Sequence, residues 1–292
     1  MKLARPPKCP SGLREFNLRK QQMVFDAMLP YATQVVSYDV LRDGTDTSLA
    51  DVHSQRYFEG VLDGTVQNGF WDVDPRKVDH AMASCDAMQA AAYAVLTQND
   101  GHPKVGCAPV SGFHHAGYDY GGGYCTFNGL MATALSMKRR GLASNICIID
   151  GDGHYGDGTQ DIIDKLCIDY VHHVSLASTE VRTLADALQR VNRAMGRRPY
   201  DLVLYQAGMD AVKGDPSGAG YLDHAEVNQR DFEVFRACKE TGTPVVWNLA
   251  GGYNGAVTYA LHTHTLASAL LVFYPEQNLL SSAPAGWSGK VE

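Results

Sequence analysis

The chain alternates short apolar runs with longer segments in which apolar residues recur at helical spacing. The apolar runs predict strands at residues 34–38, 105–110, 146–149, 170–176, 202–205 and 245–249. The segments with helical period predict helices at residues 18–29, 78–96, 127–140, 179–195, 224–239 and 253–271. Strands that alternate with helices of this length favour right-handed βαβ units, so the pattern predicts an α/β fold with a parallel sheet.

The pattern runs from residue 15 to residue 272 without an internal repeat or a Pro/Ser-rich linker. We therefore expect a single domain over residues 1–272. The tail at residues 273–292 is polar and interrupted by Pro and Gly, so it is either disordered or laid on a neighbouring surface.

Polar residues directly follow four of the predicted strands. Because parallel α/β folds bind ligands outside the carboxyl ends of their strands, these segments predict one site at one edge of the sheet. In chain order they read Ser111-Gly-Phe-His114-His115-Ala116, Asp150-Gly-Asp152-Gly-His154-Tyr155-Gly-Asp157-Gly-Thr159-Gln160, Gln206-Ala-Gly-Met-Asp210 and Ala250-Gly-Gly-Tyr253-Asn254.

The second of these segments places three carboxylates and an imidazole within eight residues. Charges packed this closely repel one another unless a cation neutralises them, which points to a bound metal. Asp152 and His154 lie two positions apart and face one side of an extended segment, and Asp210 would complete the ligand set. Three protein ligands with an open position for water are typical of catalytic zinc, although carboxylate-rich ligation also suits iron(II) or cobalt.

The tandem histidines His114 and His115 follow a predicted strand and a Gly-Phe turn. Asp150 and Asp157 are available to hold one imidazole each through its far nitrogen, which would raise its basicity. Such pairs fit a general base that takes a proton from water and a general acid that gives one to a leaving amine. Asp157 has an alternative role as a helix N-cap, because a Gly-Thr-Gln helix start follows it.

Tyr253 follows two glycines, which let the backbone pass close to a ligand. Its phenol could donate a hydrogen bond to a developing oxyanion, and the alternative is an aromatic core residue at a helix start. The pair His172-His173 lies inside a predicted strand, where its rings point to opposite faces, so we expect it to be structural. We expect the same of the isolated histidines His53, His224, His262 and His264.

Composition and charge exclude several classes of function. A content of 45% hydrophobic and 20% charged residues is ordinary for a soluble protein, and the net charge of −7 argues against non-specific binding to nucleic acid or anionic membranes. The seven cysteines include no Cys-x-x-Cys pair, which favours a reduced, cytoplasmic protein with thiols in its core. The N-terminus lacks the apolar core of a signal peptide, and no apolar run reaches about 18 residues, so we expect no membrane span.

These segments resemble the zinc-dependent histone deacetylase and acetylpolyamine amidohydrolase family. The resemblance rests on five motifs in the family's order between residues 105 and 254. They are Ser-Gly-Phe-His-His-Ala, Gly123-Tyr124-Cys125-Thr-Phe-Asn128, the run Asp150–Gln160, Gln-Ala-Gly-Met-Asp and Gly-Gly-Tyr-Asn. A weaker echo, Val52-His-Ser-Gln-Arg-Tyr57, suggests that the similarity begins near residue 50 or earlier.

The resemblance implies a three-layer α/β fold of the arginase/deacetylase type, with a central parallel sheet of about eight strands flanked by helices. It implies one zinc ion per chain, held by Asp152, His154 and Asp210. It also implies a structural potassium ion near the same segment, with the ligand positions Asp150, Asp152, His154, Ser175 and Leu176.

The resemblance assigns proton transfer to two histidines, each backed by a carboxylate: His114 by Asp150, and His115 by Asp157. It gives Tyr253 the task of polarising the amide carbonyl beside the zinc. It places Gly123, Tyr124 and Gly252 against the substrate.

Three positions depart from the family's pattern. Tyr155 stands where the family usually has a second histidine, and Tyr124 adds a hydroxyl to an aromatic tunnel wall. After Leu176 the family typically has a long Gly/Pro-rich loop that supplies the opposite wall, whereas here residues 177–180 run almost at once into the predicted helix. We therefore expect a tunnel that is half open, or one completed by the C-terminal tail or a second subunit.

The sequence thus predicts a metal-dependent amidohydrolase that removes an acetyl or other acyl group from an N-acylated amine. The substrate could be a protein acyl-lysine, an acetylpolyamine or a small metabolite, and a homo-oligomer remains open. The alternatives are a ureohydrolase of the arginase type with two manganese ions, and a non-catalytic binding protein on the same fold.

Overall fold

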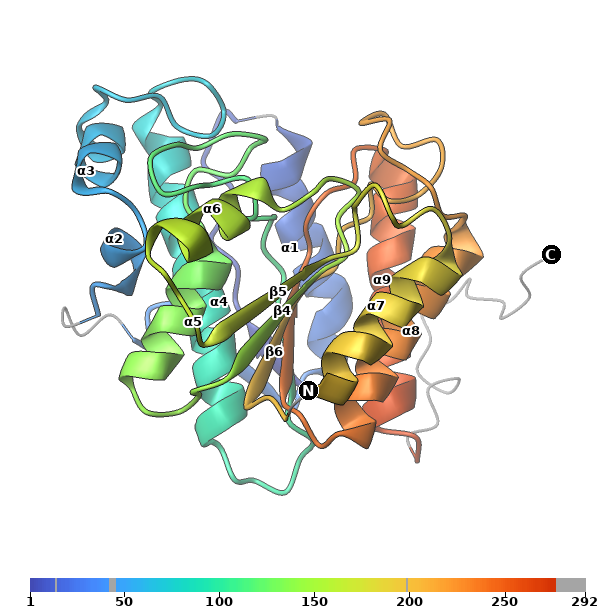
Figure 1. Ribbon diagram of the computed structural model, residues 1–292. Helices are drawn as coiled ribbons and strands as arrows, with labels where there is room; N and C mark the ends of the chain where they lie inside the picture. Colours follow the sequence, from blue (N-terminus) through green and yellow to red (C-terminus); the bar gives the residue numbers. More distant parts are fainter. Residues whose placement is uncertain (14, 42–45, 198, 277–292) are drawn as a thin grey trace.

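A parallel sheet forms the centre of the molecule (Figure 1). The computed structural model describes residues 1–13, 15–41, 46–197 and 199–276. Within these residues, seven parallel strands form the sheet in the order β2-β1-β3-β7-β6-β4-β5. The strands are β1 (Lys2–Ala4), β2 (Gln34–Val36), β3 (Val105–Ala108), β4 (Ile146–Asp150), β5 (Val171–Ser175), β6 (Leu202–Gln206) and β7 (Val245–Asn248).

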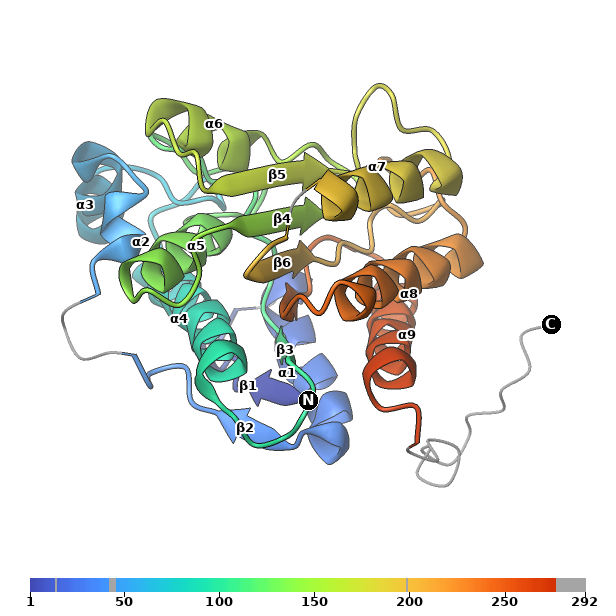
Figure 2. The same cartoon turned by 60° about the horizontal axis from the view of Figure 1, so that its bottom comes forward.

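Helices cover both faces of the sheet and complete a three-layer fold (Figures 1 and 2). One face carries α4 (Pro75–Thr97) and α5 (Gly129–Arg139), with α2 (Ser48–Asp51), α3 (Gln55–Asp63) and α6 (Asp157–Lys165) beside them. The other face carries α1 (Phe16–Met28), α7 (Leu184–Arg197), α8 (His224–Glu240) and α9 (Gly255–Phe273), and a short 3-10 helix, η1 (Leu29–Tyr31), follows α1.

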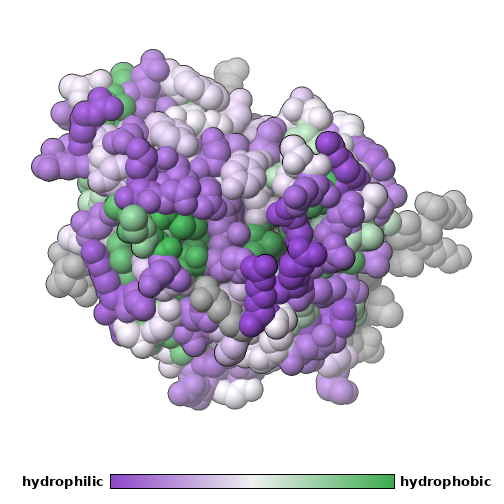
Figure 3. All heavy atoms as spheres, viewed as in Figure 1, coloured by the Kyte–Doolittle hydropathy of each residue, from purple (hydrophilic) through white to green (hydrophobic). Residues whose placement is uncertain are grey.

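The central strands are apolar because both of their faces are buried. Side chains alternate along each strand, so β4 sends Ile149 into the core beneath α8 and α9 and Ile148 into the core beneath α4 and α5. In β7, Trp247 and Val246 divide between the same two cores. The apolar sides of the helices are buried in this packing. The face of the molecule in Figure 3 is largely hydrophilic, with smaller hydrophobic areas.

The register of the sheet brings the carboxyl ends of its central strands to one level. Asp150 at the end of β4 pairs with Ser175 of β5 and with Gln206 of β6. Gln206 pairs in turn with Asn248 of β7, and Asn248 pairs with Ala108 of β3. The polar segments that follow these strands therefore begin side by side, as the sequence predicts.

The six predicted strands and six predicted helices are all present, with ends that move by a few residues. The sheet has seven strands among the described residues instead of about eight. The sequence pattern misses β1, α2 and α3 and indicates α6 only by a helix start after Asp157. The helix expected from residue 179 begins at Leu184. Its start is fixed by Thr183 and Asp186, because the Thr183 N–H donates to the Asp186 carboxylate and the Asp186 N–H donates to Thr183 Oγ1.

By length and composition alone, α9 is the one helix of the described residues that could cross a membrane, and half of its apolar window is buried. It packs against α1 and α8, and Leu261, Leu266 and Leu270 lie in the core. A helix inside a folded layer needs the same apolar composition. The expected tail at residues 273–292 lies beyond the described residues from residue 277 onward.

Candidate active site

The predicted metal ligands meet at the carboxyl edge of the sheet. Asp152 and His154 follow β4, and Asp210 follows β6. One ligand atom from each of the three residues lies within 4.8 Å of the others. His154 Nδ1 lies 2.8 Å from Asp210 Oδ2 and 3.2 Å from Asp152 Oδ1, and a tetrahedral zinc site places its ligand atoms about 3.3 Å apart. The donor set therefore fits one zinc-type ion.

The remaining oxygens of the two carboxylates bind backbone amides from other loops. The N–H of Gly251 donates to Asp152 Oδ2 over 3.0 Å, and the N–H of Gly153 donates to Asp210 Oδ1 over 2.9 Å. Gly251 is required here, since a Cβ at this position would lie 2.4 Å from the Asp210 carboxyl carbon. These contacts hold the ligands in place from outside the metal position.

Electrostatics at this cluster favour a bound cation. Burial and the neighbouring Asp152 raise the pKa of the Asp210 carboxyl to about 6. Hydrogen bonds to Asp152 and Asp210 raise the pKa of His154 to about 10. Two buried carboxylates so close together repel, and a divalent ion would relieve that repulsion.

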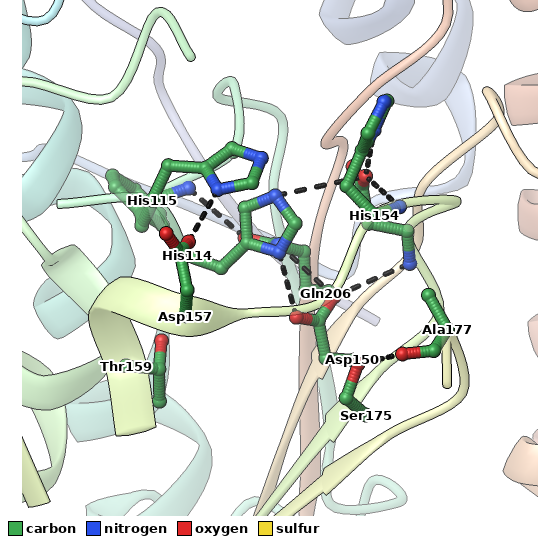
Figure 4. Close-up of polar contacts among 12 residues, drawn as sticks. His114, His115, Asp150, His154, Asp157, Thr159, Ser175, Ala177 and Gln206 are labelled. Carbon is green, nitrogen blue, oxygen red and sulfur yellow. Dashed lines mark hydrogen bonds and ion pairs between the residues drawn. The ribbon is translucent and has the colours of Figure 1, made fainter. Parts of the chain in front are cut away.

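Each of the tandem histidines is hydrogen-bonded to a carboxylate (Figure 4). The Nδ1 of buried His114 donates to Asp150 Oδ2 over 2.7 Å, and the Nδ1 of the more exposed His115 donates to Asp157 Oδ1 over 2.6 Å. Burial lowers the pKa of His114, but the carboxylates of Asp150 and Asp152 outweigh it and raise that pKa to about 9. In each of these two pairs the aspartate bonds Nδ1 of the imidazole, so Nε2 is not used by that aspartate.

Asp157 reaches His115 from the first residue of α6, and the N-cap position belongs to Gly156. The start of α6 packs directly on the histidine loop. The N–H of Thr159 donates to the His114 carbonyl over 2.9 Å, and a Cβ on Gly158 would lie 2.5 Å from the carbonyl carbon of His115. The Gly-Thr pair after Asp157 therefore serves this contact, and the alternative role of Asp157 as an N-cap does not apply.

Gln206, the first residue of the Gln-Ala-Gly-Met-Asp motif, is a further member of the site, and the sequence alone assigned it no role. Its side-chain amide donates to Asp150 Oδ1 over 3.1 Å, and its Oε1 accepts the N–H of Phe113 over 3.0 Å. This fully buried residue joins the carboxylate behind His114 to the backbone immediately before His114. A buried glutamine leaves no periodic or spacing signal in the sequence.

Tyr253 and Lys20 close the inner part of the site. Burial raises the pKa of the Tyr253 phenol above its usual range, so the O–H remains protonated and able to donate. Its backbone N–H donates to Asp215 Oδ2 over 2.8 Å. Lys20 of α1 is buried and donates to the carbonyls of Ala250 and Gly251, which fixes the segment that leads to Tyr253. Nothing in the sequence marks Lys20 as a site residue, because a lone lysine in a helix normally faces solvent.

A cavity of about 420 Å³ opens over these groups. Its lining includes His114, His115, Asp152, His154 and Tyr253, together with the predicted substrate contacts Gly123 and Tyr124. Gly252 is not among the described lining residues. A Cβ at that position would lie 2.8 Å from Met209 and Thr258, and the adjacent Gly251 lines the cavity.

The wall across from Tyr124 is not supplied by the segment after Leu176. Among the described residues, none from 176 to 183 lines the cavity, and Pro216 and Ser217 of the loop after β6 do so. The cavity lining therefore combines the aromatic rings of Tyr124 and Tyr253 with the small side chains of Pro216 and Ser217.

Residues 15–181 and 170–269 match the family model of the histone deacetylase domain. The chain belongs to the histone deacetylase domain family. Acetylpolyamine amidohydrolase 1 of Pseudomonas aeruginosa is 36% identical over 209 residues, which cover 57% of this chain and 57% of that protein. Histone deacetylase 2 of Arabidopsis thaliana is 30% identical over 167 residues, which cover 49% of this chain and 42% of that protein. The chain thus spans about half the length of these relatives.

Solved structures share the fold. The acetylpolyamine aminohydrolase of Burkholderia pseudomallei superposes with a TM-score of 0.69 at 17% identity, over 93% of this chain and 99% of that chain. The HD domain of HDA15 gives a TM-score of 0.66 at 17% identity, over 97% of this chain and 99% of that chain. At this identity the likeness establishes the α/β deacetylase fold and nothing finer.

In this histone deacetylase domain, Tyr155, one of the departures from the family's pattern, lies beside His173, which in turn lies near Asp150. His173 of β5, which we interpreted as structural, has its Nε2 3.8 Å from Asp150 Oδ2, and its ring lies 5.9 Å from that of Tyr155. His172 points the other way and bonds the hydroxyl of Tyr200. One ring of the pair therefore lies beside the site, on the face that the strand alternation assigns to it.

The residues expected around potassium in this family lie close together. Leu176 donates its N–H to the Asp150 carbonyl over 2.8 Å, and Ser175 is the register partner of Asp150. The Ser175 hydroxyl donates to the Ala177 carbonyl over 3.3 Å (Figure 4). The potassium assignment stays a prediction.

Proposed function

We propose that this chain hydrolyses the amide bond of an N-acylated amine and releases a carboxylic acid and a free amine. The observation that carries the proposal is the junction of three elements at one cavity: the ligand set Asp152, His154 and Asp210, two His–Asp pairs, and a protonated Tyr253. The relatives of this chain include proteins named as a histone deacetylase and as an acetylpolyamine amidohydrolase, which supports amide hydrolysis as the reaction.

Asp152, His154 and Asp210 would hold one zinc ion per chain. When bound, that ion polarises the amide carbonyl and lowers the pKa of the attacking water. The rest of the catalytic task falls to side chains of this chain.

His115 takes the proton of the attacking water, and Asp157 stabilises the imidazolium that forms. The water oxygen bonds to the carbonyl carbon, and the Tyr253 hydroxyl donates a hydrogen bond to the oxyanion. His114 gives a proton to the amide nitrogen as the carbon–nitrogen bond breaks, and Asp150 with Gln206 keeps its ring oriented. Lys20 holds the Ala250–Gly251 carbonyls that set the position of Tyr253.

The test is a metal analysis of the purified protein combined with hydrolysis of acetyl-lysine peptides, acetylpolyamines and small N-acetyl amines. We expect about one zinc-type ion per chain and release of free amine. His115→Ala should lose most of the activity, and His224→Ala, which changes an exposed histidine at the start of α8, should keep it. Two manganese ions per chain would favour a ureohydrolase, and a loaded protein that hydrolyses none of the panel would favour a binding protein.

The potassium ion rests on the family resemblance, supported by the proximity of Asp150, Ser175 and Leu176. We expect the midpoint of thermal unfolding to rise when KCl replaces LiCl at constant ionic strength. An equal midpoint in both salts would remove the potassium from the proposal.

A further inference from the structure

Trp71 is the most exposed large hydrophobic side chain of the described residues, with 57% of its surface accessible. It lies in the loop between α3 and α4, and the mechanism above gives it no role. Its backbone φ is +60°, and that of Tyr124 is +65°, in the left-handed region that bulky residues rarely adopt. Strained backbone that persists at the edge of a cavity is often connected with function.

The loop that carries Trp71 is fastened to the loop that carries Tyr124. The N–H of Tyr124 donates to the Gly69 carbonyl over 3.0 Å, and the N–H of Gly69 donates to Thr126 Oγ1 over 3.1 Å. A Cβ on Gly69 would lie 2.2 Å from the Cys125 carbonyl oxygen, so the two backbones are in direct contact. The exposed ring is therefore presented by a fixed support.

A continuous series of rings leads from the surface to the inner site. The Trp71 ring lies 5.5 Å from the Tyr124 ring at an edge-to-face angle of 75°, and the Tyr124 ring lies 5.9 Å from that of Tyr253. Phe70 supports Tyr124 from another side at 5.5 Å. Tyr124 lines the cavity and Trp71 adjoins it from outside the described lining, so a group that leaves the cavity on that side of the Tyr124 ring would meet Trp71.

Few charged side chains line the cavity that such a group would leave. Lys20 and Asp152 are the charged side chains, histidines aside, among the described lining residues, and both are buried. In the Trp71 loop, Asp72 is already paired with Lys77, and Asp74 with Arg76. Pro216 and Ser217, which have small side chains, also line the cavity.

We propose that Trp71, together with Tyr124, binds an uncharged aryl or alkyl group on the leaving amine and so makes this chain selective for apolar N-acyl amines. This inference rests on the proposed hydrolytic function and extends it to a substrate class. Packing between aromatic faces is worth roughly a factor of ten in binding. The cavity of about 420 Å³ has room for a ring as well as a chain.

Three amides that share a four-carbon chain test the inference: N-butylacetamide, N-(4-aminobutyl)acetamide and N-(4-phenylbutyl)acetamide. For the wild type we expect kcat/KM to be highest for the phenyl compound and lowest for the ammonium compound. Trp71→Ala should lower kcat/KM for the phenyl compound about tenfold through KM and change the butyl compound little. Trp71→Phe should keep most of the preference. Val73→Ala is the matched control, because Val73 is 50% exposed in the same loop.

A preference of the wild type for the ammonium compound over the butyl compound would overturn the inference, as would an equal loss on all three amides in Trp71→Ala. Calorimetric titration of the phenyl compound separates this inference from the proposed function. If no amide is hydrolysed but the phenyl compound binds the wild type more tightly than Trp71→Ala, the hydrolytic function fails and the role of Trp71 stands. Without hydrolysis and without that difference in binding, both fail.

Discussion

Replacing Gln206 by Met tests whether the support behind His114 matters as the structure indicates. The change keeps the length and approximate volume of the side chain and removes both of its hydrogen bonds. Asp150 Oδ1 loses the Gln206 donor at 3.1 Å but keeps the Asp152 N–H at 3.2 Å, whereas the Phe113 N–H loses its acceptor at 3.0 Å.

The expected magnitudes follow from these two losses. A buried N–H without an acceptor costs about 1–3 kcal/mol, and a lost hydrogen bond to a charged carboxylate costs about 1.5–3 kcal/mol. Partial relaxation makes the sum smaller than the two maxima, so we expect a loss of about 3 kcal/mol in the free energy of unfolding. For a chain of 292 residues, that corresponds to a fall of about 5 °C in Tm.

Activity should fall as well, because the carboxylate that orients His114 is less firmly held. If the transition state loses half or all of the free energy of the hydrogen bond to the carboxylate, kcat falls about tenfold to a hundredfold. Metal content should remain at the wild-type level, since Gln206 touches none of the three proposed ligands.

The assay combines thermal unfolding, metal content and steady-state kinetics on the best substrate of the panel. Gln89→Met is the matched control, because Gln89 is a buried glutamine of α4 that lines a separate cavity beside Tyr38 and Met82. Wild-type kcat and Tm in Gln206→Met would show that this bridge is not needed. A loss of the same size in Gln89→Met would show that any buried glutamine has this effect.

The remaining predictions concern the metal, the oxyanion and acid stability. Asp210→Ala should lose bound metal and activity together, and normal turnover by this variant would refute the ligand assignment. Tyr253→Phe should keep its metal and lose about a hundredfold to a thousandfold in kcat; an unchanged kcat would remove its oxyanion role. Burial lowers the pKa of His53 to about 4, so its stabilising contribution is complete above pH 6.5, and about 3 kcal/mol is lost by pH 4. Chemical denaturation against pH should show this loss in the wild type and less of it in His53→Gln, whose amide can replace the bonds to Gly117 O and Asn128 N; equal curves would contradict it.

The central part of the site could be predicted from the sequence because its residues follow strands. A parallel sheet in register brings strand ends together, so motifs far apart in the chain, such as His114-His115 and Asp150–Asp157, have one place to meet. Each motif also combines residue types whose chemistry is specific. Spacing and chemistry together were sufficient to select the two histidines, the two supporting carboxylates and the three candidate ligands. The assignment of each carboxylate to its histidine came from the family resemblance.

The parts that escaped prediction depend on contacts between distant segments. Gln206, Lys20 and His173 are isolated polar residues whose importance comes from what surrounds them, and no local pattern reports burial. The strand β1 has three residues and is too short for a periodic signal. The expected substrate contact at Gly252 stays a prediction: Gly251 is in the described cavity lining, and the packing of Met209 and Thr258 against Gly252 leaves no trace in the sequence.

The double use of the ligand carboxylates has a consequence for how the protein matures. Asp152 and Asp210 each bind a backbone amide with the oxygen that the metal does not need, over 3.0 Å and 2.9 Å. Protein amides thus share in holding this arrangement, and we expect the chain to be able to fold first and take up its ion afterwards. The ion that a given molecule carries would then be decided by which metals the surroundings supply at that moment, and an empty molecule could be loaded later without refolding.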